Sequence, residues 1–192
     1  VPFDYTGLPI VLPPGVTDLQ GTITRPVNGS GGKLYGFEVA GTVPFEVITP
    51  ALEGFGLTGG AGYTKTSIRP GVGASAEDLP DYSRWVANGT LFFEKWGFSA
   101  RGSVRYRSSF VGQFVGFGGE RELRRALSET IVDAQIGYEF QKGSALEGLS
   151  FFLQGQNLTD EPFVSVDTGA SIQTRNYQSY GARYMAGFNY RF

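Results

Sequence analysis

The 192-residue chain contains no cysteine and no histidine. The absence of cysteine excludes disulfide bonds, and the absence of both residues excludes the usual zinc sites and every nucleophile that histidine activates. We therefore expect no enzyme activity, no metal site and no cofactor. The formal net charge of −2 lacks the excess of basic residues typical of nucleic-acid binding, so we expect no nucleic-acid partner.

Long hydrophobic runs are absent as well. No stretch approaches the roughly 20 consecutive apolar residues that a membrane-spanning helix needs. The first residues, Val1 to Asp4, lack the charged and apolar regions of a signal peptide, which suggests that Val1 is not the natural start of the protein. Any membrane role must therefore use strands.

Aromatic residues and glycine are abundant instead. Aromatics make up 15% of the chain, and glycine occurs 29 times, a mixture that favours strands and turns over helices. From about Gly21 onward, apolar and polar residues alternate in segments that are separated by clusters of Gly, Pro, Asn and Asp. The alternation is clearest from Tyr180 to Phe192, where every even position is apolar or aromatic.

The alternation predicts about seven strands, around residues 35–45, 55–63, 85–93, 98–110, 132–140, 151–156 and 180–192. Several exceed the five or six residues usual in globular proteins, and each can supply the roughly 9 to 11 residues of a tilted transmembrane strand. The segment 28–32 is either a hairpin turn, which would give an eighth strand, or an irregularity within one long strand.

The connections between these segments alternate in length. Short ones are expected at 49–53, 95–97 and 141–148, and long ones at 70–81, 115–125 and 167–176. Outer-membrane barrels have short periplasmic turns and long extracellular loops. Residues 1–18 contain four prolines and no sustained alternation, so we expect an irregular extracellular loop there. The predicted fold class is all-β, an antiparallel transmembrane β-barrel.

Three segments resemble TonB-dependent outer-membrane receptors. Residues 24–29 (Thr-Arg-Pro-Val-Asn-Gly) and 33–38 (Lys-Leu-Tyr-Gly-Phe-Glu) are similar to a family strand in which Gly-x-Glu follows an Asn. Residues 152–163 resemble a late strand with an Asn-Leu-Thr-Asp motif, and residues 180–192 resemble the closing strand with its terminal aromatic residue. The motifs occur in the family order and cover roughly residues 20–192.

The resemblance implies a place near the end of a larger barrel. Family members have a 22-stranded barrel that is occluded by an N-terminal plug, and the plug engages TonB. The chain would supply about the last seven or eight strands, with residues 19–192 as the C-terminal portion of the barrel and residues 1–18 as the remnant of an extracellular loop. An open sheet would expose two unpaired edges to lipid, so partner strands are expected outside this chain.

The resemblance also implies a function, which is uptake of a scarce nutrient across the bacterial outer membrane. The nutrient would be an oligosaccharide or a metal-siderophore. The expected partners are outer-membrane lipid, this small ligand, the TonB complex through the plug, and the barrel-assembly machinery, for which Phe192 is the expected signal.

Charged residues on the polar faces of the strands are the candidate site. They are expected to face the barrel lumen and to pair with one another or with the plug, and they are Glu38, Arg101, Arg105, Arg107, Asp133, Glu139 and Arg183. An anion-binding role for the arginines is the alternative, because guanidinium groups bind phosphate and carboxylate well. The charged run 120–125 is expected to be a solvated loop, and Trp85 and Trp96 are expected to be interfacial anchors.

Two other folds and functions remain open at this point. A complete eight-stranded barrel, acting as an anchor or adhesion protein, requires the sheet to close on itself. A soluble carbohydrate-binding β-sandwich requires the aromatic faces to meet in one dry core.

Overall fold

The structure is a computed structural model that describes residues 2–8, 11, 14–15, 20–22, 30–71, 73–115, 121–169 and 173–191. Its regular elements are strands, apart from two single turns of 3-10 helix, η1 (Phe45–Val47) and η2 (Pro50–Leu52). Within these residues we find no helix of the length and apolarity that crossing a membrane would take. Every strand pairing is antiparallel, so the prediction of an all-β antiparallel protein is confirmed.

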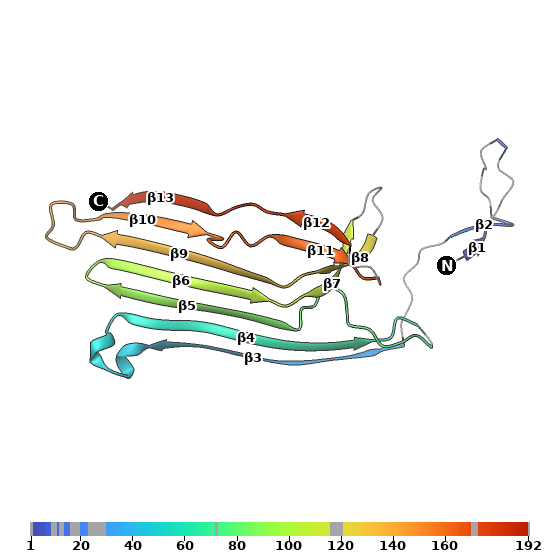
Figure 1. Cartoon of the computed structure of the whole chain (residues 1–192), viewed down its shortest axis with the longest axis horizontal. Helices are drawn as coiled ribbons and strands as arrows, with labels where there is room; N and C mark the ends of the chain where they lie inside the picture. The colour runs from blue at the N-terminus through green and yellow to red at the C-terminus, as the bar shows by residue number, and fades with distance from the viewer. Residues whose placement is uncertain are drawn as a thin grey trace.

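One sheet of seven strands forms most of the described chain (Figure 1). Its order is β13, β10, β9, β6, β5, β4, β3. The strands are β3 (Gly32–Pro44), β4 (Phe55–Ile68), β5 (Trp85–Lys95), β6 (Phe98–Arg107), β9 (Glu129–Glu139), β10 (Leu149–Gln156) and β13 (Arg183–Tyr190). Since β3 and β13 are the two edges, the described strands do not close into a barrel, and the size of a complete barrel stays a prediction.

A second sheet of four strands continues the first at one end. Its order is β12, β11, β8, β7, and its strands are β7 (Phe110–Val115), β8 (Arg121–Ala126), β11 (Phe163–Asp167) and β12 (Thr174–Gln178). β7 follows β6, β8 precedes β9, β11 follows β10, and β12 precedes β13, each across an interruption of two to six residues. We call this the outer sheet.

The outer sheet overturns part of the loop prediction. The segments 115–125 and 167–176 are not long loops, because most of their described residues lie in β8, β11 and β12. The charged run is likewise part of a strand from Arg121 onward, and Glu120 lies outside the described residues. These hairpins stay extended because cross-strand pairing satisfies their backbone groups and brings side chains together, such as the rings of Phe114 and Phe163 at 6.3 Å.

The alternation of connections between the two ends of the sheet is confirmed. The two-residue turn Trp96–Gly97 joins β5 to β6, residues 140–148 join β9 to β10, and η1 with η2 lies between β3 and β4. Figure 1 shows these three connections at the end of the sheet where the C-terminus lies, with the outer sheet at the opposite end. Both turn residues have positive φ, 56° for Trp96 and 79° for Gly97, the conformation that a tight hairpin requires.

Three of the residues expected to form an irregular N-terminal loop lie in a short strand. A three-residue strand, β1 (Pro2–Asp4), pairs with β2 (Gln20–Thr22). The ring of Tyr5 packs over Gly21, where an added Cβ would lie 2.6 Å from the ring. Of the proposed turn at 28–32, the first two residues lie outside the described residues. Ser30 and Gly31 form backbone hydrogen bonds with Arg69, and β3 begins at Gly32.

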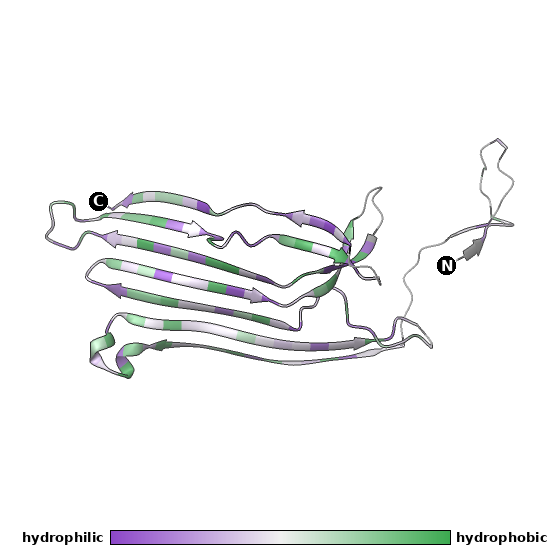
Figure 2. Cartoon of the chain, viewed as in Figure 1, coloured by the Kyte–Doolittle hydropathy of each residue, from purple (hydrophilic) through white to green (hydrophobic). Residues whose placement is uncertain are grey.

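The register of the large sheet gives it two chemically different faces. Residues directly opposite one another in antiparallel strands share a face, and Phe37 lies opposite Tyr63, which lies opposite Trp85. In the same way Phe98, Tyr138, Phe151 and Phe188 lie opposite one another in turn. We call the side that these rings share the aromatic face and the other side the polar face. Figure 2 shows the resulting alternation of hydropathy along the strands.

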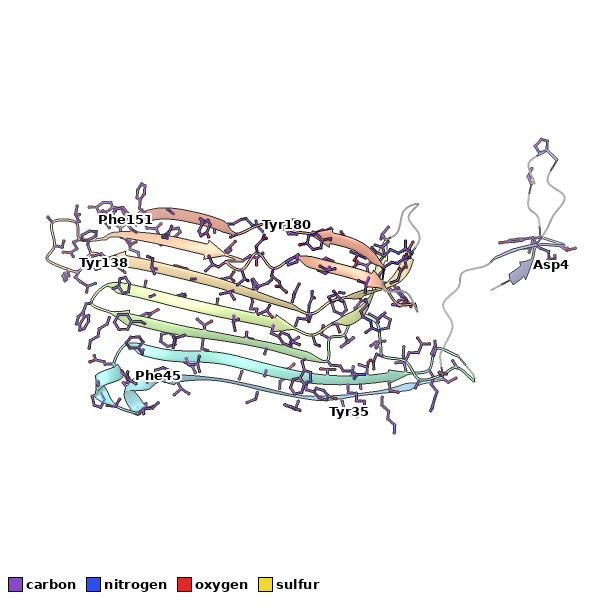
Figure 3. The ribbon with its side chains drawn as sticks, viewed as in Figure 1. Asp4, Tyr35, Phe45, Tyr138, Phe151 and Tyr180 are labelled. Carbon is purple, nitrogen blue, oxygen red and sulfur yellow. The ribbon has the colours of Figure 1, made fainter. Side chains whose placement is uncertain are left out.

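Rings gather at the two ends of the aromatic face. Near the outer sheet, the rings of Tyr63 and Trp85 are 4.7 Å apart and those of Phe37 and Tyr63 are 5.9 Å apart. Near the short turns, a belt crosses β4 to β13 through the ring pairs Phe55–Phe93, Phe93–Phe98, Tyr138–Phe140, Phe140–Phe151 and Phe151–Phe188. Tyr138 and Phe151 are labelled at this end in Figure 3.

The distance between the two belts suits a membrane. The eight-residue step along β4 from Tyr63 to Phe55 covers about 26 Å at the usual rise per residue. A strand tilt of about 40° reduces this step to about 20 Å along the membrane normal, and the rings extend it at both ends. The result matches the apolar band of roughly 25 Å that outer-membrane barrels present between their aromatic girdles.

Candidate functional site: the polar face of the sheet

All seven predicted site residues lie on the polar face. Glu38 is on β3, Arg101, Arg105 and Arg107 are on β6, Asp133 and Glu139 are on β9, and Arg183 is on β13. The register connects them, because Arg107 lies opposite Val86 on one side and Glu129 on the other, and Arg101 lies opposite Gln135. Charges from four strands therefore share one surface, as their alternation predicts.

The three arginines of β6 each have a carboxylate partner on a neighbouring strand. Arg105 Nη2 lies 3.1 Å from Asp133 Oδ2, which is the pairing that the sequence suggests. Arg107 pairs with Glu129 at 3.0 Å, and Arg101 pairs with Glu94 at 3.0 Å. Each arginine is neutralised by an acid of the same sheet. The structure therefore favours a structural role for these arginines over an anion-binding role.

Asp133 holds two groups at once. Its Oδ2 accepts a hydrogen bond from Arg105, and its Oδ1 accepts one from the backbone N–H of Asn157 at 2.9 Å. The Asp133 side chain is 21% exposed while that of Arg105 is 61% exposed. The carboxylate is thus the less solvated partner, and its bond to Asn157 anchors the interruption between β10 and β11.

Asn157 organises that interruption, which spans residues 157–162. Its side-chain amide donates to the carbonyl of Glu161 at 3.1 Å and accepts from the N–H of Glu161 at 2.9 Å. Its φ of 51° is left-handed, a conformation that Asn tolerates better than most residues. Glu161 in turn accepts from the N–H of Thr130 at 3.1 Å, and Asp160 accepts from the hydroxyl of Ser179 at 2.9 Å. The Asn-Leu-Thr-Asp motif therefore ties β10 to the strands on both sides.

The interruption inserts two residues into one strand of the wall. From Gly155 to Ser165 the chain advances ten residues, while its neighbour advances only eight, from Ala134 to Ala126. The side-chain period of a strand is two, so an insertion of two residues leaves each face where it was. Residues that lie opposite one another therefore still share a face on both sides of the interruption.

The remaining predicted residues are not brought into this cluster. Among the described residues no ion pair joins Glu38, Glu139 or Arg183 to a partner. Arg183 lies opposite Gln156 at the sheet edge, and Glu139 lies opposite Ser150 near the short turns. Phe192, the predicted assembly signal, lies outside the described residues.

The Gly-x-Glu segment has a packing reason for its glycine. A Cβ at Gly36 would collide with the backbone carbonyl of Tyr63 on β4. Across the same pair of strands, Glu38 lies opposite Gly62, with a small hollow of about 230 Å³ beside them. The glycines of β4 therefore leave room for the carboxylate of Glu38 on the polar face.

The outer sheet carries a second group of charges. Arg124 pairs with Glu122 at 2.9 Å, and the Nε of Arg175 donates to Asp167 at 2.6 Å. The hydrogen bond with Asp167 raises the pKa of Arg175, and the charges of Asp167 and Glu122 raise it further. Both effects favour the charged form of Arg175.

Sequence reasoning missed several residues of this site. Glu94 and Glu129 form the ion pairs with Arg101 and Arg107, and Glu161 accepts a hydrogen bond from Thr130. Glutamates are common at exposed strand and loop positions, so the sequence does not distinguish these three. The sequence feature that could have predicted the interruption is Asn157, which stands shortly before Asp160 and Glu161, because Asn favours turns with left-handed φ.

The comparisons with known proteins agree with this geometry. A family model described as "TonB dependent receptor-like, beta-barrel" matches residues 4–158, which covers most of the chain. No curated protein and no solved structure matches the chain. The matched residues run from β1 to Asn157 and Leu158, where the interruption between β10 and β11 begins.

Proposed function

Because this chain belongs to the TonB-dependent receptor-like β-barrel family, we propose that it forms part of the barrel wall of a receptor that takes up a nutrient. Membership places the chain in the bacterial outer membrane and makes TonB a partner of the receptor. The proposal adds that the seven strands cross the membrane, that they belong to a larger barrel, and that the wall itself performs no chemistry.

The observation that carries the proposal is the two-faced sheet. Its aromatic face has rings at both ends and aliphatic or small residues between them, and it lies exposed, with Phe188 at 70% and Phe37 at 56%. Such a surface is costly in water and suited to lipid. The polar face carries the paired arginines and acids, which suits a water-filled or plugged lumen.

A soluble β-sandwich fits this arrangement poorly. That fold needs a second sheet packed on the aromatic face, about 10 Å away. In the part of the chain that the structure describes, no second sheet covers that face, and only Ala126 and Val166 form a buried apolar core. Both of these residues belong to the outer sheet.

A closed barrel of eight strands also finds no support. β3 and β13 lie at opposite edges of the sheet, and each has one neighbour. Hydrocarbon cannot satisfy the free backbone groups of two such edges, so the sheet needs further strands on both sides. A larger barrel supplies them, and residues 19–192 would then be one portion of its wall.

The lumen charges take a structural role in this proposal. Arg101, Arg105 and Arg107 bind acids of adjacent strands and fix the register on the wet side of the wall. Glu38 and Arg183 have no such partner among the described residues, which leaves them available to a plug or a passing ligand. The nutrient would be an oligosaccharide or a metal-siderophore.

Cysteine labelling of adjacent residues tests the proposal. The chain has no cysteine, so Leu91→Cys on the aromatic face and Thr90→Cys on the polar face differ by one position on β5. In outer-membrane vesicles that contain the full-length receptor, a water-soluble maleimide should label Thr90→Cys several-fold faster than Leu91→Cys. Equal labelling rates, or release of the protein from the membrane by alkaline washing, would contradict the proposal.

Growth on single nutrient sources tests the finer part. A strain that lacks the receptor gene should lose growth on a limiting oligosaccharide or on limiting siderophore-bound iron, and the intact gene should restore it. Loss of neither kind of growth would overturn the uptake role while leaving the barrel wall intact.

A further inference from the structure

The outer sheet continues the register of the large sheet between β6–β7 and β8–β9. Arg107 lies opposite Glu129, and three residues further along each strand Phe110 lies opposite Ala126. The steps on the two strands are equal, so alternate positions stay on the side where they began. Odd-numbered residues of β7 and β8 therefore share the side of Arg107, which is the polar face.

Apolar side chains surround Arg125 on this side of the outer sheet. Val111 and Val166 lie opposite Arg125 on the two neighbouring strands, and Leu123 lies two residues along β8. Val166 is buried, but Leu123 is 45% exposed and Val115, further along β7, is 72% exposed. The polar face thus carries paired charges in the large sheet and an exposed apolar surface in the outer sheet. Exposed apolar surface of this kind marks a binding surface.

A hollow of about 720 Å³ lies against this surface. It lies between the connection from β4 to β5 and the outer sheet, and its walls include Tyr82, Arg84, Ser109, Val111, Leu123 and Arg125. Trp85 and Ser108 border it where β6 gives way to β7, and Trp85 N–H donates to the Ser108 hydroxyl at 3.0 Å. Asp81 fixes the connection, because its N–H donates to the carbonyl of Val111 at 2.8 Å and its carboxylate accepts from the N–H of Gln113 at 3.3 Å. The hollow is therefore a built feature of the fold.

One cation in the hollow has no carboxylate partner. Arg84 is neutralised by Asp78 at 2.8 Å, and the neighbouring Arg124 points to the other side of β8, where Glu122 neutralises it. Arg125 is exposed, and in the part of the chain that the structure describes no carboxylate lies within ion-pair distance of it. A free guanidinium group binds a carboxylate with two parallel hydrogen bonds.

The other groups of the hollow suit a sugar ring. A pyranose presents hydroxyl groups at its edge and C–H groups on its faces. Tyr82 is nearly half exposed and presents ring surface for such a face. The hydroxyls of Ser109 and Thr168 and the carboxylate of Glu77 are hydrogen-bonding groups for the edge.

We propose that this hollow binds a hexuronic-acid unit of an acidic oligosaccharide. Arg125 binds the carboxylate, the ring of Tyr82 contacts a face of the sugar, and the hydroxyls and carboxylates of the hollow contact its hydroxyl groups. The proposal rests on the proposed function and names its nutrient as an acidic oligosaccharide. It requires the polar face to line the lumen and the outer sheet to stand at the extracellular mouth.

Binding of matched sugars by the full-length receptor tests the proposal. The probes are trimers of galacturonate, glucuronate and mannuronate, each as the free acid and as its uncharged methyl ester. Isothermal titration calorimetry in detergent micelles measures their affinities. At least one trimer should bind, and its acid should bind about tenfold more tightly than its ester, as expected for one charge-assisted contact. Arg125→Gln should remove this difference and leave the affinity for the ester unchanged.

Arg124→Gln is the matched control, because it makes the same change of charge one position away, on the other side of β8. It should bind the acid as the wild type does. Tyr82→Leu should weaken the acid and the ester alike, since the ring contact does not depend on charge. Resistance to SDS at room temperature shows that each variant is folded.

Three results would overturn the sugar site. They are failure of the wild type to bind any trimer, equal affinity of the wild type for acid and ester, and unchanged preference for the acid in folded Arg125→Gln. The first two need only the wild-type protein, so they decide the question even if a variant does not fold.

The two proposals fail in different ways. If the receptor binds no trimer but supports growth on siderophore-bound iron, the acidic-sugar site is wrong and the uptake role stands. If Thr90→Cys and Leu91→Cys are labelled at equal rates, the proposed function itself is wrong.

Discussion

At the scale of single residues, the wall depends on a few polar side chains with two partners each. Asp133 is the clearest example, since it binds a guanidinium group with one oxygen and a backbone N–H with the other. The two bonds contribute differently to the free energy of unfolding. The ion pair with Arg105 is exposed and contributes little, whereas the N–H of Asn157 is part-buried and loses its partner if the carboxylate is removed.

Asp133→Ala should therefore destabilise the folded receptor by about 1–3 kcal/mol, the cost of leaving a part-buried N–H without a partner. Urea unfolding of the full-length protein in detergent micelles measures the change. Arg105→Ala, which removes only the exposed partner, should change the free energy of unfolding by no more than about 1 kcal/mol. A larger effect for Arg105→Ala than for Asp133→Ala would reverse this assignment.

At the scale of elements, turns and interruptions control the register of the wall. The turn Trp96–Gly97 places both residues at positive φ, and a Cβ at Gly97 would collide with the carbonyl of Glu139 on the next strand. Glycine is required there for two reasons, its backbone freedom and its lack of a side chain.

Gly97→Ala should lower the free energy of unfolding by more than about 1 kcal/mol, because the new side chain adopts a strained backbone and also meets a carbonyl oxygen. The temperature at which the folded, SDS-resistant form is lost measures the effect. Gly102→Ala on β6 is the matched control, since its added Cβ meets no atom within 4 Å and its φ is not positive. If the two variants melt together, the turn does not limit stability.

The interruption at 157–162 allows a test of parity. Deleting both Leu158 and Thr159 removes the inserted pair and keeps each face of β11 in place, although the bonds of Asn157 to Glu161 are weakened. Deleting Thr159 alone shifts β11 by one residue and exchanges its faces, which would expose the buried Val166 to the wrong side.

We expect the two-residue deletion to yield folded receptor in the outer membrane and the one-residue deletion to yield little. Cell fractionation followed by gel shift on heating measures both. Equal yields would show that the strand can slip without regard to its faces.

At the scale of the whole molecule, the open edges decide what the sheet can be. β3 and β13 are separated by five strands, and each presents a free row of backbone groups. In lipid, these rows must find partners in other strands.

Cross-linking across the sheet tests this arrangement. Leu153→Cys and Ala186→Cys lie opposite each other on β10 and β13 and should form a disulfide readily. Val39→Cys on β3 and Ala186→Cys should not cross-link within one chain. A disulfide in the second pair would mean that the sheet closes on itself, and a small closed barrel would replace the proposed larger one.

The strands and their two faces could be predicted from the order of residues along the chain. Alternation is a local property, so the positions from Phe98 to Phe110 or from Tyr180 onward already separate aromatic from charged residues. For the same reason all seven predicted charged residues lie on one face of the sheet. The short turns could be predicted because glycine and its neighbours indicate a turn from the local sequence alone.

Which strands pair and which side chains meet depends on the fold of the whole sheet. The acid partner of Arg101 or Arg107, the two residues inserted after Gln156, and the continuation of the strands into the outer sheet all depend on register between segments far apart in the chain. Period-two alternation is unchanged by a shift of two residues, so it fixes the face of a side chain but leaves its neighbour across the strand undetermined.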